Sequence, residues 1–334
     1  MAPQQSQDAR RPPPQLMSVV VPFLNEAEGL PRLIQELASA LNDNNQPWEL
    51  VLVDDGSQDR SLAVARAELA RWPRLTAQLL SLTRNFGKEA ALTAGLEASR
   101  GTVIVPLDAD LQDPPSLIRT MIENWRQGYD VVYAVRRRRE GEGWMKRFTA
   151  FAFYRLISRV SDTNIPADTG DFRLMDRCVV DALLQMPERT RFMKGLFAWV
   201  GFQQTAIYYD RDARCEGKSS WNYWKLWNFA VDGLTSFSRV PLQVIGSTGS
   251  TLAIAAFGYG AWIIARTILF GVDLPGYASL LTIILFLGGV QLISIGVLGE
   301  YLGRIFIEVK RRPLYLIRSR EDLGPRQELN KPLT

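Results

Sequence analysis

The sequence predicts an α/β fold with a mostly parallel sheet, followed by interfacial amphipathic helices and a C-terminal two-helix transmembrane hairpin. Three observations predict this architecture. Short β-branched runs alternate with helical segments in the first half, acidic motifs follow several of those runs, and apolar residues dominate from 244 to about 305. Strands that alternate with helices form βαβ units, whose parallel sheet is buried on both faces.

The alternation predicts five strands and four helices before residue 136. The strands are residues 17–23, 48–53, 77–82, 102–107 and 130–135. The helices lie between residue 28 and about 41, and at 61–71, 88–99 and 115–127. Ligands of a parallel sheet bind outside the carboxyl ends of its strands. Polar motifs stand at those ends, so topology and residue type predict the same site: Asn25-Glu26, Asp54-Asp55 and Asp108-Ala109-Asp110.

Changes in composition set the predicted domain boundaries. We assign residues 1–16 to a disordered tail, 17–220 to a cytosolic α/β domain, 221–240 to an interfacial helix, 241–305 to two transmembrane helices and 306–334 to a cytosolic tail. Two segments, 144–160 and 221–237, mix aromatic and apolar residues with Arg and Lys. This mixture is typical of helices at the headgroup level of a membrane, and ordinary core helices are the alternative.

Two apolar segments are long enough to cross a bilayer, which takes about 20 residues. They are Val244 to Ala265 and Ala278 to Leu302. Arg239 precedes the first and three bases, 310–312, follow the second, so the positive-inside rule places both chain ends in the cytosol. We therefore expect a multi-pass protein of the plasma membrane. A buried hairpin in a soluble protein is the alternative, but two such segments in tandem argue against it.

The composition excludes several kinds of chemistry. The chain has no histidine, which removes Ser-His-Asp triads and histidine-ligated zinc. Its two cysteines show neither metal spacing nor a disulfide framework. Acid–base and metal chemistry must therefore use Asp and Glu. The net charge is +4, and the bases cluster at 136–139, 146–147 and 310–312. Two of these three clusters lie beside apolar segments, which favours a membrane surface over nucleic acid as a partner.

The motif after the fourth strand predicts a metal site. Asp108, Asp110 and Gln112 can project to one side of an extended chain. Two carboxylates and an amide oxygen suit Mg²⁺ or Mn²⁺, with diphosphate oxygens and water completing the coordination. Such an ion would neutralise a leaving diphosphate. An ordinary acidic loop is the alternative.

The motif after the second strand, Asp54-Asp55-Gly56-Ser57, has two compatible interpretations. A carboxylate here can accept hydrogen bonds from a base or a ribose. The same stretch can form an Asx-turn or cap the next helix through Ser57 and Asp59. A phosphoribosyltransferase motif is excluded, because the Thr-Gly-x-Thr phosphate loop is missing.

Three further groups belong to the predicted site. Lys88 lies on the same rim as the acidic motifs, although a solvated charge is the alternative. Asp171 is the candidate for orienting the nucleophile, and helix capping is its alternative. The basic loop with Arg211, Arg214 and Lys218 suits phosphate oxygens, and a solvated basic loop is the alternative.

Taken together, the motifs resemble family 2 glycosyltransferases with the Rossmann-like GT-A fold, and within them the polyprenyl-phosphate glycosyltransferases. The matching stretches run in order over residues 18–226: VVVPFLNEAEGL, LVDDGSQDRS, LTRNFGKEAALTAGL, VPLDADLQDPP, DTGDFRLMD and RDARCEGKSSWNYWKL. The two C-terminal spans match the bacterial subgroup. Cys215 departs from the pattern, which usually carries a bulky apolar residue there, and no Gln-x-x-Arg-Trp motif of a processive synthase is present.

The resemblance implies roles for individual residues. It implies catalytic roles for Asp110 and Asp171, and gives Arg211, Arg214 and Lys218 to a loop that covers the site. It implies a metal and diphosphate site of Asp108, Asp110 and Gln112. It implies a nucleotide pocket formed by Pro22, Leu24, Glu26, Val53, Asp55, Lys88, Asp108 and Ala109.

The resemblance also implies an activity. We expect an inverting transferase that uses Mg²⁺ or Mn²⁺ to move glucose from UDP-glucose to undecaprenyl phosphate at the cytosolic membrane face. Two alternatives stay open: another donor sugar of the mannose or aminoarabinose type, or a non-catalytic transport or flippase subunit. The expected partners are a nucleotide sugar, a polyprenyl-phosphate lipid and the membrane, without nucleic acid. The oligomeric state stays open, with a homo-oligomer allowed.

Overall fold

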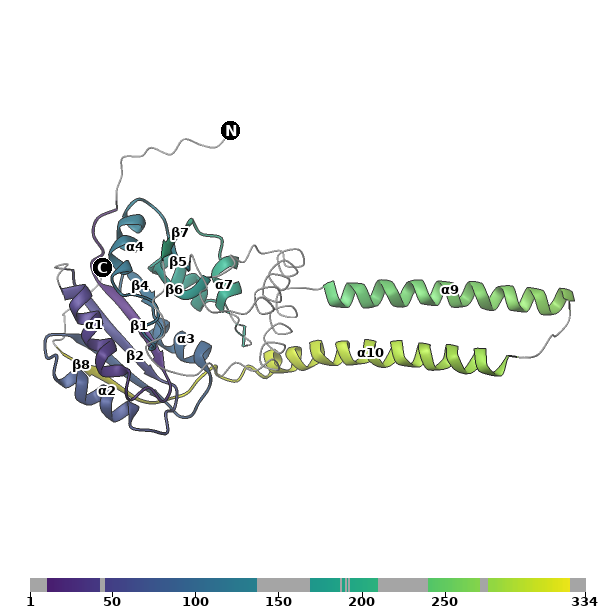
Figure 1. Ribbon diagram of the computed structural model, residues 1–334, viewed down its shortest axis with the longest axis horizontal. Helices are drawn as coiled ribbons and strands as arrows, with labels where there is room; N and C mark the ends of the chain where they lie inside the picture. Colours follow the sequence, from purple (N-terminus) through teal and green to yellow (C-terminus); the bar gives the residue numbers. More distant parts are fainter. Residues whose placement is uncertain are drawn as a thin grey trace, which may run out of the picture. The chain divides into compact units, whose positions relative to one another are not determined.

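The computed structural model describes residues 11–42, 46–136, 169–186, 188–189, 191, 193–209, 240–270 and 276–324. These residues belong to two compact units. One unit holds the α/β domain together with the C-terminal residues from 313 onward, and the other holds two long apolar helices (Figure 1).

The α/β unit is built on one sheet with the strand order β7-β5-β6-β4-β1-β2-β3-β8. The four strands β4, β1, β2 and β3 are parallel neighbours, whereas β6 and β8 run antiparallel to the strands beside them. The mostly parallel sheet that the sequence predicts is therefore confirmed. The strands are β1 (Met17–Phe23), β2 (Trp48–Asp54), β3 (Thr76–Leu82), β4 (Val103–Pro106), β5 (Val131–Arg136), β6 (Thr169–Asp176), β7 (Gln204–Tyr209) and β8 (Ile317–Leu323).

Helices cover both faces of this sheet. The helices of the unit are α1 (Leu30–Asn42), α2 (Ser61–Ala70), α3 (Lys88–Ala98), α4 (Leu117–Arg126), α6 (Arg177–Leu184) and α7 (Met193–Trp199). The apolar side chains of α1, α2 and α4 join the alternate strand residues that face them in one core, while α3 packs on the opposite face against β1 and β2. The sequence of α1 explains how such a helix covers the sheet with one face. Its buried residues recur at helical spacing: Leu30, Leu33, Ile34, Leu37, Ala38 and Leu41.

The five predicted strands and four predicted helices are confirmed, with ends that differ from the prediction by at most about two residues. The elements β6, β7, β8, α6 and α7 were not predicted. Strand β8 lies inside the segment that we assigned to a cytosolic tail, and it pairs with β3 at the edge of the sheet.

The first described residues, 11–16, also differ from the disordered tail that we predicted there. The backbone N–H of Arg11 donates to the carbonyl of Arg126 at 2.8 Å. Its guanidinium pairs with Asp130 at 2.7 Å and lies 5.4 Å from the ring centre of Trp125. An ion pair and a cation–π contact therefore hold this stretch against the domain.

The second unit contains α9 (Val240–Phe270) and α10 (Tyr277–Lys310). The segments Ile245–Phe270 and Phe286–Lys310 are long and apolar enough to cross a membrane. Large apolar side chains stand exposed along them, with Phe257 80% and Phe270 83% exposed, as expected of surfaces that face lipid. The predicted interfacial helices, 144–160 and 221–237, lie outside the described residues.

Glycine at position 95 allows α3 to approach the sheet. A Cβ atom at this position would lie 2.3 Å from Cγ1 of Val20 and 3.1 Å from Cγ2 of Val53. We predict that Gly95→Ala destabilises the protein by about 1–2 kcal/mol, because overpacking outweighs the gain in helix propensity. Thermal melting in detergent measures this change. The control is a double-mutant cycle with Val20→Ala. The double variant should lose less stability than the sum of the losses of the two single variants. Additive losses would show that the two side chains do not clash.

Candidate functional site

A cavity of about 280 Å³ opens where the carboxyl ends of β1, β2 and β4 meet the amino end of α3. This is the position that the parallel topology predicts for a ligand. Four carboxylates and one ammonium group belong to its lining. The lining residues are Pro22, Phe23, Leu24, Glu26, Asp55, Asn85, Gly87, Lys88, Ala91, Asp108, Ala109 and Asp110.

A larger cavity, of about 520 Å³, lies at the amino ends of β2 and β3 and is lined by Trp48, Trp72 and Arg74 among others. It contains no acidic side chain. Because size without converging reactive groups says little about chemistry, we assign the candidate site to the smaller, acidic cavity.

Lys88, the first residue of α3, holds the cavity together. Its Nζ lies 2.6 Å from Oδ1 of Asp108 and 2.5 Å from Oδ2 of Asp171, so one ammonium group joins the end of β4 to β6. Burial lowers the pKa of Lys88, but the carboxylates of Asp171 and Asp108 raise it by more than burial lowers it. The net pKa therefore lies well above its usual range. Lys88 is thus a charged group held by two carboxylates, and 46% of its side chain is exposed to solvent.

The carboxylates of the cavity outnumber this cation. Burial raises the pKa of Asp108, and the nearby charges of Asp171 and Asp110 raise it further, against the opposing effect of Lys88. Burial and the Asp110 and Asp59 carboxylates likewise raise the pKa of Glu26. Such crowding of like charges is relieved by a bound cation.

The chemistry of these donors fits a divalent ion that is shared with a ligand. Asp108 and Asp110 both line the cavity and supply hard carboxylate oxygens. Over the part of the chain that the structure describes, no three acidic or sulfur ligands converge into a complete cage. Mg²⁺ often binds in this way, through one or two carboxylates with substrate phosphates and water completing its shell.

The two acids that end β2 have separate tasks. Both oxygens of Asp55 face the next loop: Oδ1 accepts the N–H of Phe86 at 2.8 Å and Oδ2 that of Gly87 at 3.0 Å. Asp54 accepts the N–H of Ser57 at 2.9 Å and the hydroxyl of Ser81 at 3.0 Å. Asp54 therefore makes the predicted turn, while Asp55 lines the cavity and fixes the 84–87 loop. Burial raises the pKa of Asp55, although these two N–H groups oppose the increase.

Strained backbone lies beside the cavity. Asn25 and Leu111 have left-handed φ angles of 55° and 53°, which non-glycine residues rarely adopt. Asn25 is held by Ser57 and Gln58, because its N–H donates to the Ser57 hydroxyl and its side-chain oxygen accepts the Gln58 N–H. Leu111 separates Asp110 from Gln112. Strain at both loops is consistent with a site whose geometry is imposed by its surroundings.

A buried arginine supports Asp171 from behind. Arg173 is 4% exposed, and its guanidinium lies 3.7 Å from the ring centre of Phe197. Its Nη2 donates to the carbonyl of Gly170 at 2.8 Å, and its Nε donates to that of Asp171 at 3.4 Å. Burial lowers the pKa of Arg173 to about 10, although the Asp171 carboxylate opposes this change. Asp171 itself lies in β6 and not at a helix start, so the helix-cap interpretation is wrong for it.

Most predicted site residues meet in the cavity: Pro22, Leu24, Glu26, Asp55, Lys88, Asp108, Ala109 and Asp110. Val53 and Gln112 do not line the cavity. Val53 is fully buried in β2, and Gln112 is buried in the loop after β4. The role of Gln112 as a metal ligand stays a prediction. Arg211, Arg214, Cys215 and Lys218 lie outside the described residues.

Three parts of the site escaped sequence reasoning. Asn85 lines the cavity, and its position between a strand and a helix was the available signal. Arg173 had no such signal, because its role depends on Phe197, which is distant in sequence. A buried hydrogen bond from the Tyr209 hydroxyl to Asp113 also joins the end of β7 to the loop after β4.

Comparison with known proteins identifies the family of this chain. Residues 18–184 match the family described as glycosyl transferase family 2, and residues 240–305 match the GtrB C-terminal hairpin. An uncharacterized glycosyltransferase of Synechocystis is 52% identical over 90% of this chain and 94% of its own length. A bactoprenol glucosyl transferase of Shigella phage SfX is 47% identical over 91% of this chain and 99% of its own. A crystal structure of glucosyl-3-phosphoglycerate synthase from Mycobacterium tuberculosis with Mn²⁺ and UDP-glucose has a TM-score of 0.45 and 20% identity, covering 66% of this chain and 78% of that one.

Gly56 provides a test of how the two loops of the cavity fit together. Its φ is 73°, and a Cβ atom there would lie 2.4 Å from the carbonyl carbon of Arg84. We predict that Gly56→Ala displaces the 84–87 loop and accelerates amide exchange at Phe86 and Gly87 about tenfold, the loss of roughly one hydrogen bond each. Hydrogen–deuterium exchange measures this effect.

Gly128→Ala is the matched control for this prediction. Gly128 also has a left-handed φ, of 108°, but nothing lies within 4 Å of an added Cβ atom. This variant should carry a similar backbone strain and leave the exchange at 86 and 87 unchanged. Equal effects of the two variants would mean that strain, and not the contact with Arg84, governs the loop.

Proposed function

We propose that this chain, which belongs to glycosyl transferase family 2, transfers glucose from UDP-glucose to undecaprenyl phosphate. The acidic cavity around Lys88 is the observation on which the proposal depends. A nucleoside diphosphate is itself anionic, and four lining carboxylates against one ammonium group would repel it unless a cation accompanied it. A sugar nucleotide with a divalent ion is a ligand of this kind. The relative named bactoprenol glucosyl transferase supports the sugar and the lipid.

The donor would occupy the cavity along the strand ends. Glu26 and Asp55 would accept hydrogen bonds from the nucleoside, while Lys88 would face the phosphates. Asp108 and Asp110 would hold a Mg²⁺ or Mn²⁺ ion, which when bound would neutralise the charge on the departing diphosphate. Val53 supports this pocket from the core, and Gln112 completes the proposed metal site. Arg211, Arg214 and Lys218 would close over the phosphates.

The reaction would be one in-line displacement. An oxygen of the lipid phosphate attacks the anomeric carbon of glucose, while the bond from that carbon to the donor diphosphate breaks and its electron pair leaves with the diphosphate. A single displacement inverts the anomeric centre. A phosphate is already largely ionised near neutral pH, so no base is needed to remove a proton. Asp171, held by Lys88 and by the segment that Arg173 supports, would therefore orient the acceptor.

A lipid acceptor would account for the two apolar helices α9 and α10. A polyprenyl chain stays in the bilayer, so the enzyme must meet its headgroup at the membrane surface. The apolar helices α9 and α10 would anchor the protein there, and the bases 310–312 would keep the α/β unit and the C-terminus in the cytosol.

The activity can be tested with the purified full chain, undecaprenyl phosphate and labelled UDP-glucose. We expect label to enter the lipid phase with Mg²⁺ or Mn²⁺ and not after chelation. Asp108→Ala should lower the rate by roughly a hundredfold or more, because charge stabilisation at the leaving group is lost. Glu36→Ala, which removes an exposed acid of α1 that pairs with Arg32, is the control and should react normally.

Two outcomes would contradict this assignment. A normal rate for Asp108→Ala would refute the metal site. A panel that includes UDP-glucose, GDP-mannose and an aminoarabinose donor identifies the sugar, and failure to turn over any of them would refute the transfer to a polyprenyl phosphate.

The orientation in the membrane can be tested by labelling single cysteines. In a chain with Cys178→Ser and Cys215→Ser, Asp273→Cys places a thiol between the two spans and Gln327→Cys places one in the C-terminal tail. We expect an impermeant maleimide to label position 273 in intact spheroplasts, and position 327 only after permeabilisation, as the positive-inside rule requires. The reverse pattern would place the α/β unit outside the cell.

A further inference from the structure

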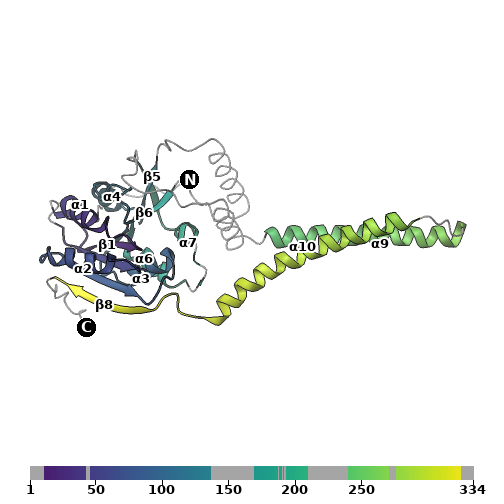
Figure 2. The same cartoon turned by 60° about the horizontal axis from the view of Figure 1, so that its bottom comes forward.

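The chain returns to the α/β unit after the hairpin. It leaves α10 at Lys310 and enters β8 at Ile317, which pairs antiparallel with β3 at the edge of the sheet. Strand β8 is the yellow arrow in Figure 2. Its charged sequence, IRSREDL, suits an edge strand, and Leu323 at its end packs against the core. The polar contacts of this segment therefore do more than bury a core.

These contacts concentrate on one structural piece, the 83–87 loop and the α3 helix that follows it. At the start of that piece, the N–H of Thr83 donates to the carbonyl of Leu316 at 2.9 Å. The guanidinium of Arg318 donates to the carbonyl of Thr83, also at 2.9 Å. The residue that opens the loop is thus held through both of its backbone polar groups.

The far end of the same piece is held as well. The Tyr315 hydroxyl donates to the Glu97 carboxylate in the last turn of α3. Arg320 donates to Oε1 of Gln78 at 2.8 Å, and the amide nitrogen of Gln78 donates to the carbonyl of Ala98 at 3.0 Å. Burial and the Glu97 carboxylate raise the pKa of Tyr315, so its hydroxyl keeps the donated proton at physiological pH.

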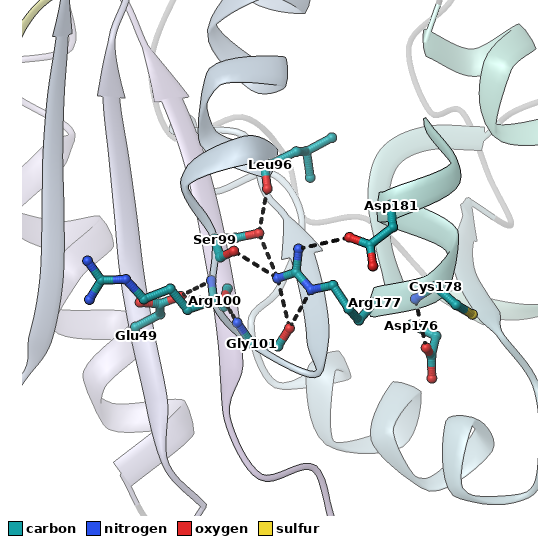
Figure 3. Close-up of polar contacts among 10 residues, drawn as sticks. Glu49, Leu96, Ser99, Arg100, Gly101, Asp176, Arg177, Cys178 and Asp181 are labelled. Carbon is teal, nitrogen blue, oxygen red and sulfur yellow. Dashed lines mark hydrogen bonds and ion pairs between the residues drawn. The ribbon is translucent and has the colours of Figure 1, made fainter. Parts of the chain in front are cut away.

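The turn after α3 is also held by hydrogen bonds, in this case from other parts of the domain. Figure 3 shows the guanidinium of Arg177 between the carbonyls of Ser99 and Gly101, at 2.9 Å and 2.8 Å, and the N–H of Arg100 on the carboxylate of Glu49 at 2.6 Å. These contacts hold the turn after α3 against β2 and the first residue of α6.

That amino end carries the chemistry of the cavity. The loop supplies the two N–H groups that fix Asp55, and α3 begins with Lys88, whose ammonium group holds Asp108 and Asp171. A shift of Thr83 would therefore be transmitted to both sides of the donor pocket.

We propose that residues 315–320, the C-terminal clasp, are a positioning element of the donor site, which holds the 83–87 loop and α3 so that Asp55 and Lys88 face the nucleotide. The donor part of this inference rests on the proposed function. The clasp touches no substrate, and it acts through Thr83 and Glu97. It makes the segment that follows the membrane hairpin a part of donor binding.

The chain offers a matched pair of variants. Tyr315→Phe with Arg318→Ala removes the side-chain contacts of the clasp to the loop and to α3, while the backbone pairing of β8 remains. Glu321→Ala is the control, because Glu321 pairs with Arg66 of α2 at 2.5 Å and, among the described residues, forms no hydrogen bond or ion pair with that loop or helix. It removes two charge-assisted hydrogen bonds, so it should disturb β8 at least as much.

Nucleotide binding, steady-state kinetics and amide exchange, all measured on the full chain in detergent, test this proposal. We expect the double variant to raise the Kd for UDP and the KM for the donor about tenfold, with the KM for the lipid phosphate changed less than about twofold, since two hydrogen bonds to the loop and helix are lost. Amide exchange over residues 84–90 should rise in parallel. Glu321→Ala should leave all four quantities unchanged.

The inference is overturned if the double variant leaves exchange and UDP binding unaltered, or if Glu321→Ala alters them equally, since the segment would then only complete the sheet. Failure of the proposed function has a different signature: the wild-type chain would bind no nucleoside diphosphate. In that case the exchange over residues 84–90 still decides whether the clasp positions the loop.

Discussion

The double ion pair of Lys88 is the interaction on which the candidate site depends. One ammonium group joins the first turn of α3 to the end of β4 through Asp108 and to β6 through Asp171. Without it, Asp108 and Asp171, which are far apart in the sequence, would be two neighbouring carboxylates with no counter-charge between them. With it, the four carboxylates that line the cavity still outnumber the one ammonium group, and a divalent cation that accompanies a phosphate ligand can balance this excess. The same contact therefore compensates two of the carboxylates and leaves the cavity acidic.

Much of this arrangement could be predicted from the sequence, because local signals and topology agree over the first half. The runs at β1 and β2 are wholly buried and lie in a parallel sheet, so they read as strands without knowledge of their neighbours. Once the strands were placed, their carboxyl ends brought Glu26, Asp55 and Asp108 together. Strand β8 carries the opposite lesson: its charged sequence resembles a solvated tail, and only pairing with β3 makes it a strand.

The site details that could not be predicted depend on contacts between distant residues. Nothing in the run TGDFRLMD shows that Arg173 turns inward onto the Phe197 ring, since arginine in a strand is usually exposed. Asp55 illustrates a subtler case. Its position at a strand end suggested a ligand contact, but the structure adds that both oxygens already accept N–H groups of the neighbouring loop. A carboxylate has further lone pairs, so the two tasks are compatible.

The place of β8 in the chain has a consequence for how the protein is made. A ribosome delivers residues 317–323 only after both apolar helices have been synthesised. Until then the outer edge of β3 lacks its partner and exposes unpaired backbone groups, the kind of edge that recruits strands from other chains. Biogenesis thus orders two events: the nascent enzyme commits its helices first and seals its sheet last.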